Sequence, residues 1–338
     1  MTCRKAGLRT LELEHGGSGR IAFPSLAAQW LLMRLGSITV AGAVLAFHQL
    51  PVTLRRANSS GIRRELTGPE ALTQASRRMT STETSASPEL KAALDAARAA
   101  AEVIRGFYQR NVKIEVKADK TPVTEADVRS EEAIRELLTR RFPTYGFYGE
   151  ETGKSDMDAE SVWLVDPIDG TKSFVRDCPF FSTQIALLRG GRFVLGVSCA
   201  PAYGELAWAE EGAGAHLNGR RIQVSQTAEL GSTIVSTGNL KTLARSAQWA
   251  KFGELIPRIS RIRGYGDFVH YHLLARGSLD VVIESDVNIL DIAALTVIVR
   301  EAGGTFTDLY GGEVGLGTTS VLATNGKLHS TISDALKV

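Results

Sequence analysis

Two aspartates three residues apart follow a short apolar segment near the middle of the chain. Residues 166–171 read Asp-Pro-Ile-Asp-Gly-Thr, and residues 161–165 before them have the composition of a buried strand. The proline keeps the residue before it extended and prevents a regular helix there. Such a turn at a strand end can direct the carboxylates of Asp166 and Asp169, and the carbonyl of Ile168, toward a hard cation such as Mg²⁺.

The two residues after this pair suit a phosphate group. Gly170 lets a ligand approach the backbone, and the amides of Gly170 and Thr171 stand where the next helix would begin. The ordinary structural alternative for an Asp-x-x-Asp pattern is a solvated turn after a strand. The full six-residue string instead predicts a combined cation and phosphate site.

Three acids elsewhere in the chain could complete such a site. Glu150, in the string Gly-Glu-Glu-Thr, offers a third carboxylate. Asp291 precedes an apolar helix, where the ordinary structural alternative is an N-cap, a role that is compatible with metal binding. Asp127, after Pro-Val-Thr, could accept a proton from a hydroxyl group or from a metal-bound water.

The distribution of charge favours a cation-binding protein over a nucleic-acid binder. The 338-residue chain has a formal net charge of +2, but residues 1–80 hold eleven Lys and Arg against four Glu and no Asp, so the remainder is acidic. The cysteines, Cys3, Cys178 and Cys199, are too few and too scattered for a disulfide framework or a zinc site. We expect reduced thiols in an intracellular protein whose partner is a small phosphate ester, with neither nucleic acid nor membrane.

Residues 1–85 form an N-terminal extension with three candidate origins. Residues 27–47 are apolar over roughly the length of a membrane span, but Arg34 interrupts them. Arg-rich, acid-poor flanks are also typical of an organellar transit peptide, and Met79 offers an alternative translation start. Because the extension lacks a core pattern, we expect a false start or a targeting segment rather than an anchor. The expected location is the cytoplasm or, with a transit peptide, an organelle.

The chain after this extension begins with helical and then strand-like patterns. Apolar spacing predicts a helix from residue 89 and a second helix over 125–141 with Thr124 as its N-cap. The inward residues expected on this second helix are Val128, Ala133, Ile134, Leu137 and Leu138. Short strands separated by Gly-rich turns then indicate an antiparallel α+β subdomain over 86–225.

The last third of the chain has a different pattern. Strands alternate with helices over residues 226–338, which indicates an α/β subdomain. One helix is expected over 292–302, ended by Gly303. No long linker separates the two halves, so we expect two packed subdomains that share a cleft.

Four blocks of the sequence resemble the signature motifs of the inositol monophosphatase family and occur in the expected order. They are 120–127 (Lys-Thr-Pro-Val-Thr-Glu-Ala-Asp), 149–152 (Gly-Glu-Glu-Thr), 166–174 (Asp-Pro-Ile-Asp-Gly-Thr-Lys-Ser-Phe), and 291–294 (Asp-Ile-Ala-Ala) with 301–304 (Glu-Ala-Gly-Gly). The resemblance implies a layered α/β sandwich of the inositol monophosphatase and fructose-1,6-bisphosphatase type. It also implies a homodimer and a Mg²⁺-dependent phosphatase with two to three ions.

The resemblance also implies a role for each candidate residue. Glu150, Asp166 and the Ile168 carbonyl would hold one Mg²⁺, and Asp166, Asp169 and Asp291 a second; some members hold a weaker third ion near Glu150. Thr171, linked to Asp127, would orient and deprotonate the attacking water. The amides of Gly170 and Thr171 would bind phosphate. A catalytically silent, metal-stabilised interaction protein is the alternative outside the enzyme class, and the intact set of acids argues against it.

The leaving-group side resembles the histidinol-phosphate phosphatase branch of this superfamily. Residues 263–268, Arg-Gly-Tyr-Gly-Asp-Phe, carry that likeness and place Gly266 and Asp267 beside the leaving group. Asp267 and Glu284 would then face the cationic amine and the imidazole of histidinol. The structural alternatives are a helix N-cap for Asp267 and a surface acid for Glu284. The alternative substrates are inositol phosphate or another sugar or nucleotide phosphate.

Two features nearby bear on this assignment. Leu290 stands where the family usually has an aromatic residue, which leaves recognition of the leaving group less defined than metal binding. His270 and His272 fall in a predicted helix, where we expect satisfied, partly buried histidines rather than catalytic ones.

Overall fold

A computed structural model describes residues 86–110, 114–116 and 122–338. The apolar segment 27–47, the alternative start at Met79 and Cys3 lie outside the described residues. Within the described ranges, no helix is both long and apolar enough to cross a membrane.

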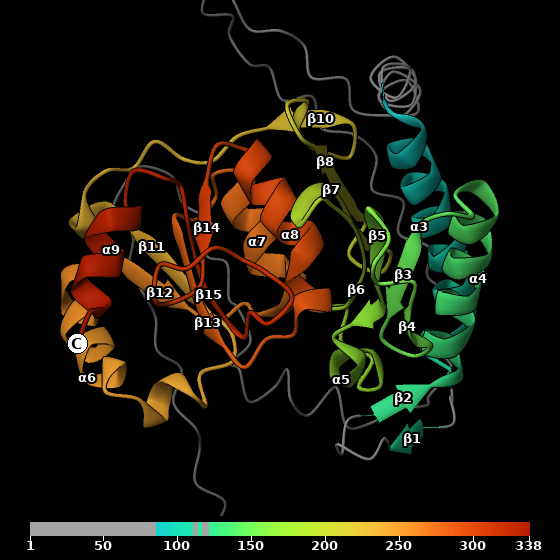
Figure 1. The fold of residues 1–338 in the computed structure, drawn as a ribbon. Helices are drawn as coiled ribbons and strands as arrows, with labels where there is room; N and C mark the ends of the chain where they lie inside the picture. The colour runs from blue at the N-terminus through green and yellow to red at the C-terminus, as the bar shows by residue number, and fades with distance from the viewer. Residues whose placement is uncertain (1–85, 111–113, 117–121) are drawn as a thin grey trace, which may run out of the picture. The chain divides into compact units, whose positions relative to one another are not determined.

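An eight-stranded sheet is built from the first half of the described chain (Figure 1). Its spatial order is β10-β9-β8-β7-β6-β5-β3-β4, and every pairing is antiparallel except the parallel pair β3 and β5. The strands are β3 (Gly146–Gly149), β4 (Gly153–Ser155), β5 (Ser161–Asp169), β6 (Ser182–Arg189), β7 (Arg192–Ala200), β8 (Glu205–Glu210), β9 (Gly214–Leu217) and β10 (Arg220–Ile222).

A second sheet of five strands is built from the last third of the chain. Its order is β12-β11-β13-β15-β14, with parallel pairing from β12 to β13 and antiparallel pairing beyond. The strands are β11 (Ile234–Thr237), β12 (Arg261–Arg263), β13 (Val281–Ser285), β14 (Thr305–Thr307) and β15 (Ser320–Thr324). The predicted change from a meander to alternating strands and helices is therefore present.

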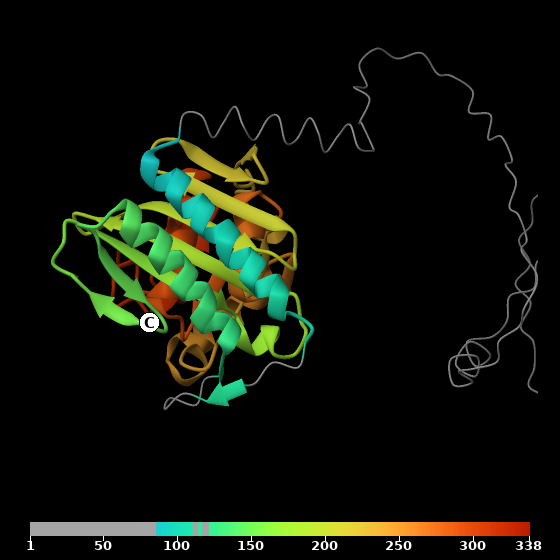
Figure 2. The same ribbon diagram turned by 90° about the vertical axis from the view of Figure 1, so that its right-hand side faces the viewer.

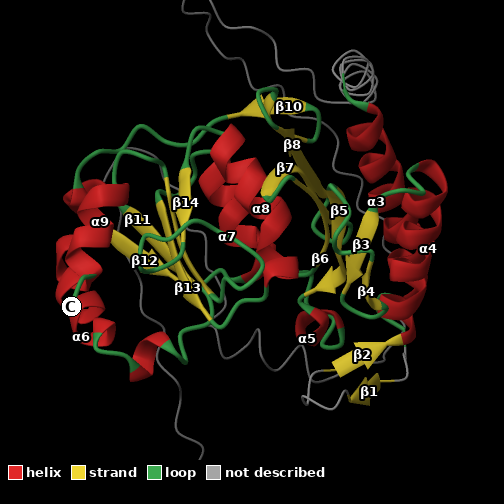
Figure 3. Cartoon of the chain, viewed as in Figure 1, coloured by secondary structure: helices red, strands yellow, loops and turns green. Residues whose placement is uncertain are grey.

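Helices cover both faces of both sheets, so the elements form alternating layers (Figure 3). The first sheet lies between the pair α3 and α4 and the pair α7 and α8, and the second sheet lies between α7 and α8 and the pair α6 and α9. The helices are α3 (Pro88–Phe107), α4 (Glu125–Arg141), α5 (Thr171–Phe174), α6 (Gln248–Leu255), α7 (Asp267–Ala275), α8 (Ile289–Glu301) and α9 (His329–Leu336). This arrangement is the layered α/β sandwich that the resemblance implied.

Shorter elements complete the described chain. A two-stranded ribbon of β1 (Ile114–Val116) and β2 (Pro122–Thr124) precedes α4. Single 3₁₀ turns lie at η1 (Leu230–Ser232), η2 (Leu243–Arg245) and η3 (Ile256–Arg258).

The outer helices α3 and α4 lie side by side over the first sheet (Figure 2). Helix α3 begins where Ser87 caps the amide of Leu90, and its buried stripe is rich in alanine, which permits close packing on α4. Helix α4 has the predicted bounds and the predicted cap, Thr124. The expectation for Val128 is wrong, because its side chain is 39% exposed. The helix instead buries three polar residues, Asp127, Ser130 and Glu131.

The middle helices α7 and α8 join the two sheets in one core. Helix α8 packs so closely on β7 that a side chain on Gly196 would come within 2.2 Å of the Ala294 carbonyl oxygen. Leu290 is buried in this core, where it contributes to packing. One rigid element from the second half of the chain therefore carries Asp291 up to the first sheet.

Candidate functional site

Three of the predicted metal ligands meet at the end of β5. Asp166 and Asp169 come from that strand and Asp291 from the first turn of α8, and one oxygen of each lies within 4.8 Å of the others. Asp166 is 2% exposed and Asp169 9% exposed. Residues more than 120 positions apart in the sequence therefore form one carboxylate cluster, in which Asp166 and Asp169 are buried and Asp291 is partly buried.

The backbone of β5 directs its two aspartates. The strand continues through Asp169, beyond the expected end at residue 165, but its pairing with β6 is irregular between Asp166 and Asp169. Within this irregular stretch the Ile168 amide donates to Asp166 Oδ1 at 2.9 Å, and the Thr183 hydroxyl donates to the Pro167 carbonyl at 2.8 Å. These bonds fix the turn from both sides.

The alternative interpretation of Asp291 as an N-cap is wrong. Asn288 is the N-cap of α8 and accepts from the Leu290 amide at 3.2 Å, while Asp291 is the third residue of the helix and accepts from the Asn288 amide at 2.9 Å. This reciprocal capping box holds the Asp291 carboxylate at the positive end of the helix dipole.

The electrostatics of the cluster call for a cation. Burial, and then the charges of Glu150, Asp169 and Asp291, raise the pKa of Asp166 well above its usual range. The pKa of Asp169 is also raised well above its usual range, first by burial and then by the charges of Asp267, Asp291 and Glu284. Burial with Glu150 raises the pKa of Asp291 to about 7. Among the described residues, Asp169 Oδ2 is buried without a hydrogen-bond partner. A divalent cation fits this donor set, because it would offset the repulsion and satisfy that oxygen.

Asp127 and Thr171 form the predicted hydroxyl–carboxylate pair. Asp127 Oδ2 accepts from the amide and the hydroxyl of Thr124 at 2.8 Å and 2.6 Å, which is the capping box of α4. Its other oxygen, Oδ1, accepts from the Thr171 hydroxyl at 3.2 Å. Thr171 also lies 3.0 Å from the Ile168 carbonyl oxygen, so two acceptors compete for one hydroxyl hydrogen. Burial, with a contribution from Glu150, raises the pKa of Asp127.

Gly170 occupies a position that excludes a side chain. Its φ is 87°, and an added Cβ would come within 2.6 Å of the Phe180 carbonyl oxygen. The first hydrogen bonds of the following turn run from the amides of Ser173 and Phe174 to the Gly170 carbonyl. The amides of Gly170 and Thr171 precede these donors and so have no acceptor within that turn.

Glu150 lies in the turn between β3 and β4, beside the carboxylate cluster. Its amide donates to the Val165 carbonyl at 3.1 Å, and its charge contributes to the raised pKa values of Asp166, Asp127 and Asp291. The turn is held by Glu131 of α4, a residue that sequence reasoning missed. Glu131 is an acid among other acids on a helix, and no local pattern distinguishes it from a surface residue.

Gly266 and Asp267 form an unusual start to α7. Their φ values are 70° and 44°, both in the left-handed region that Asp tolerates better than most residues. Gly266 is the N-cap of α7, and Asp267 is the first residue of the helix; no side chain caps this end. The N-cap interpretation of Asp267 is therefore wrong. Burial and the charge of Glu284 raise the pKa of Asp267 to about 6, against the opposing charges of His270 and Lys172.

Glu284 is buried and highly bonded, so the interpretation of it as a surface acid is wrong. Its Oε1 accepts from the Asn239 amide at 3.0 Å, and its Oε2 accepts from the Tyr271 hydroxyl at 2.9 Å and lies 3.1 Å from His270 Nε2. Burial raises its pKa, but the charge of His270 and these hydrogen bonds lower it overall.

Both histidines of α7 are satisfied inside the protein. His270 lies between Glu284 and the Ser236 hydroxyl, which is 3.3 Å from its Nδ1. His272 lies between Glu205 and the Ser198 hydroxyl at 2.8 Å and 2.9 Å. This matches the expectation for structural histidines, although both are fully buried rather than partly buried.

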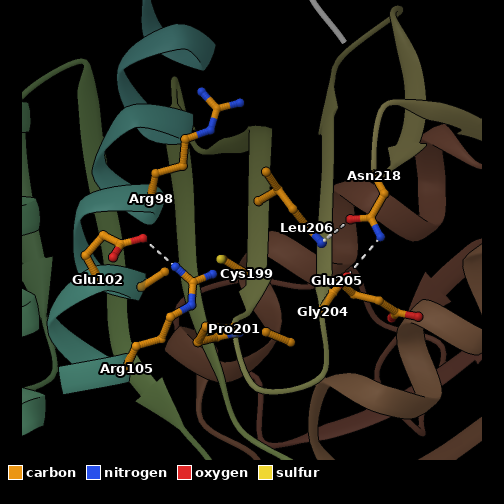
Figure 4. Close-up of a pocket in the computed structure, with 11 residues that line it drawn as sticks. Arg98, Glu102, Arg105, Cys199, Pro201, Gly204, Glu205, Leu206 and Asn218 are labelled. Atoms are coloured by element: carbon orange, nitrogen blue, oxygen red, sulfur yellow. Dashed lines mark hydrogen bonds and ion pairs between the residues drawn. The ribbon is translucent and has the colours of Figure 1, made fainter. Parts of the chain in front are cut away.

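A surface pocket of about 230 Å³ between α3 and the β7–β8 turn is lined by none of the predicted catalytic, metal-binding or substrate-binding residues (Figure 4). Arg105 in its wall pairs with Glu102, and Glu205 pairs with Arg276. Cys199 also lines the pocket, and burial raises the pKa of its thiol to about 11. A thiol in that state is a packing group and not a nucleophile.

The comparison with known proteins agrees with this geometry. The sequence model of the inositol monophosphatase family matches residues 85–337. This chain belongs to the inositol monophosphatase family. Members of the family are metal-dependent, and the buried carboxylate cluster is consistent with that property.

Individual members show how similar the chain is to its relatives. It is 41% identical over 250 residues to the histidinol-phosphatase of Mycobacterium tuberculosis, across 72% of this chain and 96% of that protein. It is 34% identical over 248 residues to the inositol-1-monophosphatase of Mesorhizobium japonicum, across 72% and 93%. The crystal structure of extragenic suppressor protein suhB from Bartonella henselae matches with a TM-score of 0.69 at 31% identity, covering 74% of this chain and 99% of that one. The chain is accordingly a phosphoric monoester hydrolase.

One block that resembles a family motif has a structural role here. Glu301 at the end of α8 accepts from the amides of Gly212 and Gly214 at 2.9 Å and 2.8 Å, and so ties that helix to the β8–β9 turn. Because Asp291 lies in the first turn of the same helix, these two bonds help to fix the position at which Asp291 meets β5.

Proposed function

We propose that this inositol monophosphatase family member is a Mg²⁺-dependent phosphatase that hydrolyses histidinol phosphate to histidinol and phosphate, a step of histidine biosynthesis. The observation that carries the choice of substrate is the position of Asp267. Its carboxylate is close enough to the cluster for its charge to raise the pKa of Asp169. The pKa of Asp267 is in turn raised by burial and by the charge of Glu284. The carboxylate of Asp267, at the start of α7, thus adds an acidic group next to the proposed metal ligands.

The proposed ligands of two to three Mg²⁺ ions are Glu150, Asp166, the Ile168 carbonyl, Asp169 and Asp291. Bound Mg²⁺ would polarise the phosphoryl group, promote formation of the attacking hydroxide and neutralise charge on the leaving oxygen. The relatives support metal dependence, and the buried oxygen of Asp169 supports a cation at this place.

Thr171 and Asp127 are the proposed catalytic pair. With the Asp127 carboxylate accepting its hydrogen, the Thr171 oxygen presents lone pairs to a water molecule and orients it as the nucleophile. Asp127 then takes the proton through Thr171, and burial, which raises the pKa of its carboxyl group, makes it a better proton acceptor than an exposed aspartate. A cation held by the Ile168 carbonyl would remove the competing acceptor.

Phosphate would bind at the start of α5. The amides of Gly170 and Thr171 lie in a backbone segment whose positive φ at position 170 is easily adopted only by glycine. Two N–H groups here would hold the phosphoryl oxygens in line with the attacking water.

The leaving group would bind near Gly266 and Asp267. A carboxylate of raised pKa in a partly buried position gains most from a cationic partner, such as the amine of histidinol. Glu284 is buried, accepts from Asn239 and Tyr271 and lies against His270, so we propose that it adds negative charge near the leaving group and holds His270 in place. The curated relative from Mycobacterium tuberculosis is named for histidinol phosphate, which supports this substrate.

An inositol monophosphatase is the second candidate. With Glu284 occupied, Asp267 is the one proposed leaving-group carboxylate that remains, and a single carboxylate could also accept a hydroxyl from a neutral polyol. The relative from Mesorhizobium japonicum is named for that activity.

Parallel assays would decide between the two substrates. The purified protein with Mg²⁺ would be given histidinol phosphate, inositol phosphate and 3′-phosphoadenosine 5′-phosphate, and kcat/KM measured for each. We expect histidinol phosphate to be preferred by at least an order of magnitude, since an unmatched buried charge is costly. A preference for inositol phosphate would overturn the histidinol assignment while leaving the phosphatase activity established.

We also propose a homodimer, on the family resemblance, and a cytoplasmic or organellar location according to the nature of residues 1–85. Light scattering would test the first proposal. Mass spectrometry of the mature N-terminus would distinguish a false start, a removed transit peptide and a retained segment.

A further inference from the structure

One face of α4 contacts two different parts of the proposed site. Asp127, Glu131 and Arg135 are spaced by four residues, and residues with this spacing share a face of an α-helix. Asp127 contacts Thr171, as described above. The next two residues both contact the β3–β4 hairpin, whose turn carries Glu150.

Glu131 binds this turn with both carboxylate oxygens. Its Oε2 accepts from the Glu151 amide at 2.8 Å, and its Oε1 accepts from the amide and the hydroxyl of Thr152 at 2.7 Å and 2.6 Å. The Glu131 side chain is fully buried. Hydrogen bonds to a buried carboxylate are short and strong. These three bonds therefore fix the backbone at Glu151 and Thr152, the two residues that follow Glu150.

Arg135 holds the hairpin one helical turn further along. Its guanidinium donates to the Thr152 hydroxyl at 2.7 Å and to the Ser155 hydroxyl at 3.3 Å, and lies 4.9 Å from the centre of the Phe147 ring. These contacts reach both strands of the hairpin. These contacts therefore tie the turn to α4.

We propose that Glu131 is a positioning residue for metal binding: it fixes the 149–152 turn so that Glu150 faces Asp166, at a separation from Asp127 that one rigid helix sets. This inference rests on the proposed role of Glu150 as a metal ligand. It adds that affinity for the ion depends on a carboxylate that never touches the ion. Groups that orient ligands typically contribute tenfold to a hundredfold to metal affinity.

Glu131→Gln, compared with Glu132→Gln, would test the proposal. Glu132 is the exposed neighbour on the same helix, so it controls for the loss of one negative charge. In Glu131→Gln, one of the two positions facing the turn becomes an NH₂ group, which cannot accept from an amide. Metal-free full-length protein would be titrated with Mn²⁺ as the probe by calorimetry, and activity would be measured against Mg²⁺ concentration.

We expect the Mn²⁺ dissociation constant to rise tenfold or more in Glu131→Gln and to stay at the wild-type value in Glu132→Gln. The Mg²⁺ concentration for half-maximal activity should rise in parallel, with a much smaller change in kcat at saturating Mg²⁺. A merely structural role would instead lower the fraction of active protein without changing its affinity for the ion. Wild-type affinity in a folded Glu131→Gln protein would overturn the proposal.

Thr152 provides a second pair of variants should Glu131→Gln fail to fold. Thr152 is exposed, so its substitutions threaten the core less. Thr152→Val removes the hydroxyl bond to Glu131, and Thr152→Ser keeps it. Weaker Mn²⁺ binding in the valine variant with rescue in the serine variant would support the proposal, and equal binding in the two would refute it. If the wild type itself binds no Mn²⁺, the proposed metal centre is wrong and this inference falls with it.

Discussion

The carboxylate of Glu131 occupies the space in which a side chain on Gly149 would lie. A Cβ built on Gly149 would come within 2.2 Å of Glu131 Oε1 and 2.5 Å of its carboxyl carbon. The glycine before the two acids of the 149–152 turn is therefore required by a residue eighteen positions earlier on α4. The need for glycine at position 149 becomes apparent only when α4 and the β3–β4 hairpin are packed together.

Gly149→Ala should destabilise the protein and weaken its metal site together. The methyl group would push Glu131 out of its three hydrogen bonds, and overpacking of this kind typically costs about 1–3 kcal/mol in the free energy of unfolding. Urea denaturation with and without Mg²⁺ would measure it, and the stabilisation by Mg²⁺ should shrink. Gly106→Ala is the control, because nothing lies within 4 Å of a Cβ at that position. A wild-type response to Mg²⁺ in Gly149→Ala would contradict the packing argument.

Asp127→Asn and Thr171→Val should each reduce kcat strongly, by about 10²–10⁴-fold, if they act as one proton-accepting pair. Mg²⁺ affinity should change little, because neither residue belongs to the carboxylate cluster. The double variant should be little worse than either single variant, since residues that act as a unit are not additive. Glu125→Gln, in the same helical turn but exposed, is the matched control. Additive losses would show that the two residues act separately.

Asp267→Asn should separate the two candidate substrates. If Asp267 binds the amine, kcat/KM for histidinol phosphate should fall by about ten- to a hundredfold, since removal of a charged partner from a buried pair typically costs a few kcal/mol. Activity on inositol phosphate and the dependence on Mg²⁺ would be the internal controls and should change far less. Equal losses on both esters would remove Asp267 from amine recognition.

The metal-free protein should lose stability as the pH rises, through Asp291 in particular. The pKa of Asp291 is about 7 in the folded protein and about 4 in an unfolded chain. Between those values the folded protein retains a proton that the unfolded chain has released, so the contribution of Asp291 to stability falls as pH rises from about 4 to about 7. Above about 7 the loss is complete.

Asp291→Asn isolates this effect from the buried histidines. The pKa values of His216, His272 and His329 are lowered, mainly by burial, which opposes the trend below about pH 6.5. The difference in melting temperature between the metal-free variant and the metal-free wild type should therefore grow in favour of the variant from pH 5 to pH 8. Mg²⁺ should stabilise the wild type more at pH 8 than at pH 6, because protons compete with the ion. A difference that does not vary with pH would contradict the raised pKa.

Local sequence determined those features that depend on near neighbours. The cap at Thr124 and the bounds of α4 follow from a capping residue and helical spacing, and the strand before Asp166 follows from a short apolar run. The change from an antiparallel meander to alternating strands and helices also follows from local patterns. The family motifs in turn indicated a phosphatase with a metal site, and the match of the family model agrees with that.

Tertiary structure decided the features that depend on residues brought together from far apart. Val128 is apolar yet exposed, while Glu131 on the same helix is charged yet buried, because burial depends on which hairpin packs there and not on residue type. Likewise Asp291 turned out to be a third-position capping residue, and Glu284 a buried acceptor of bonds from Asn239, Tyr271 and His270. Sequence alone could name the acids. Only the packing of α4 and α8 against β5 determined how deeply they are buried and how far apart they lie, and burial together with the neighbouring charges raises the pKa values of Asp166, Asp169 and Asp291.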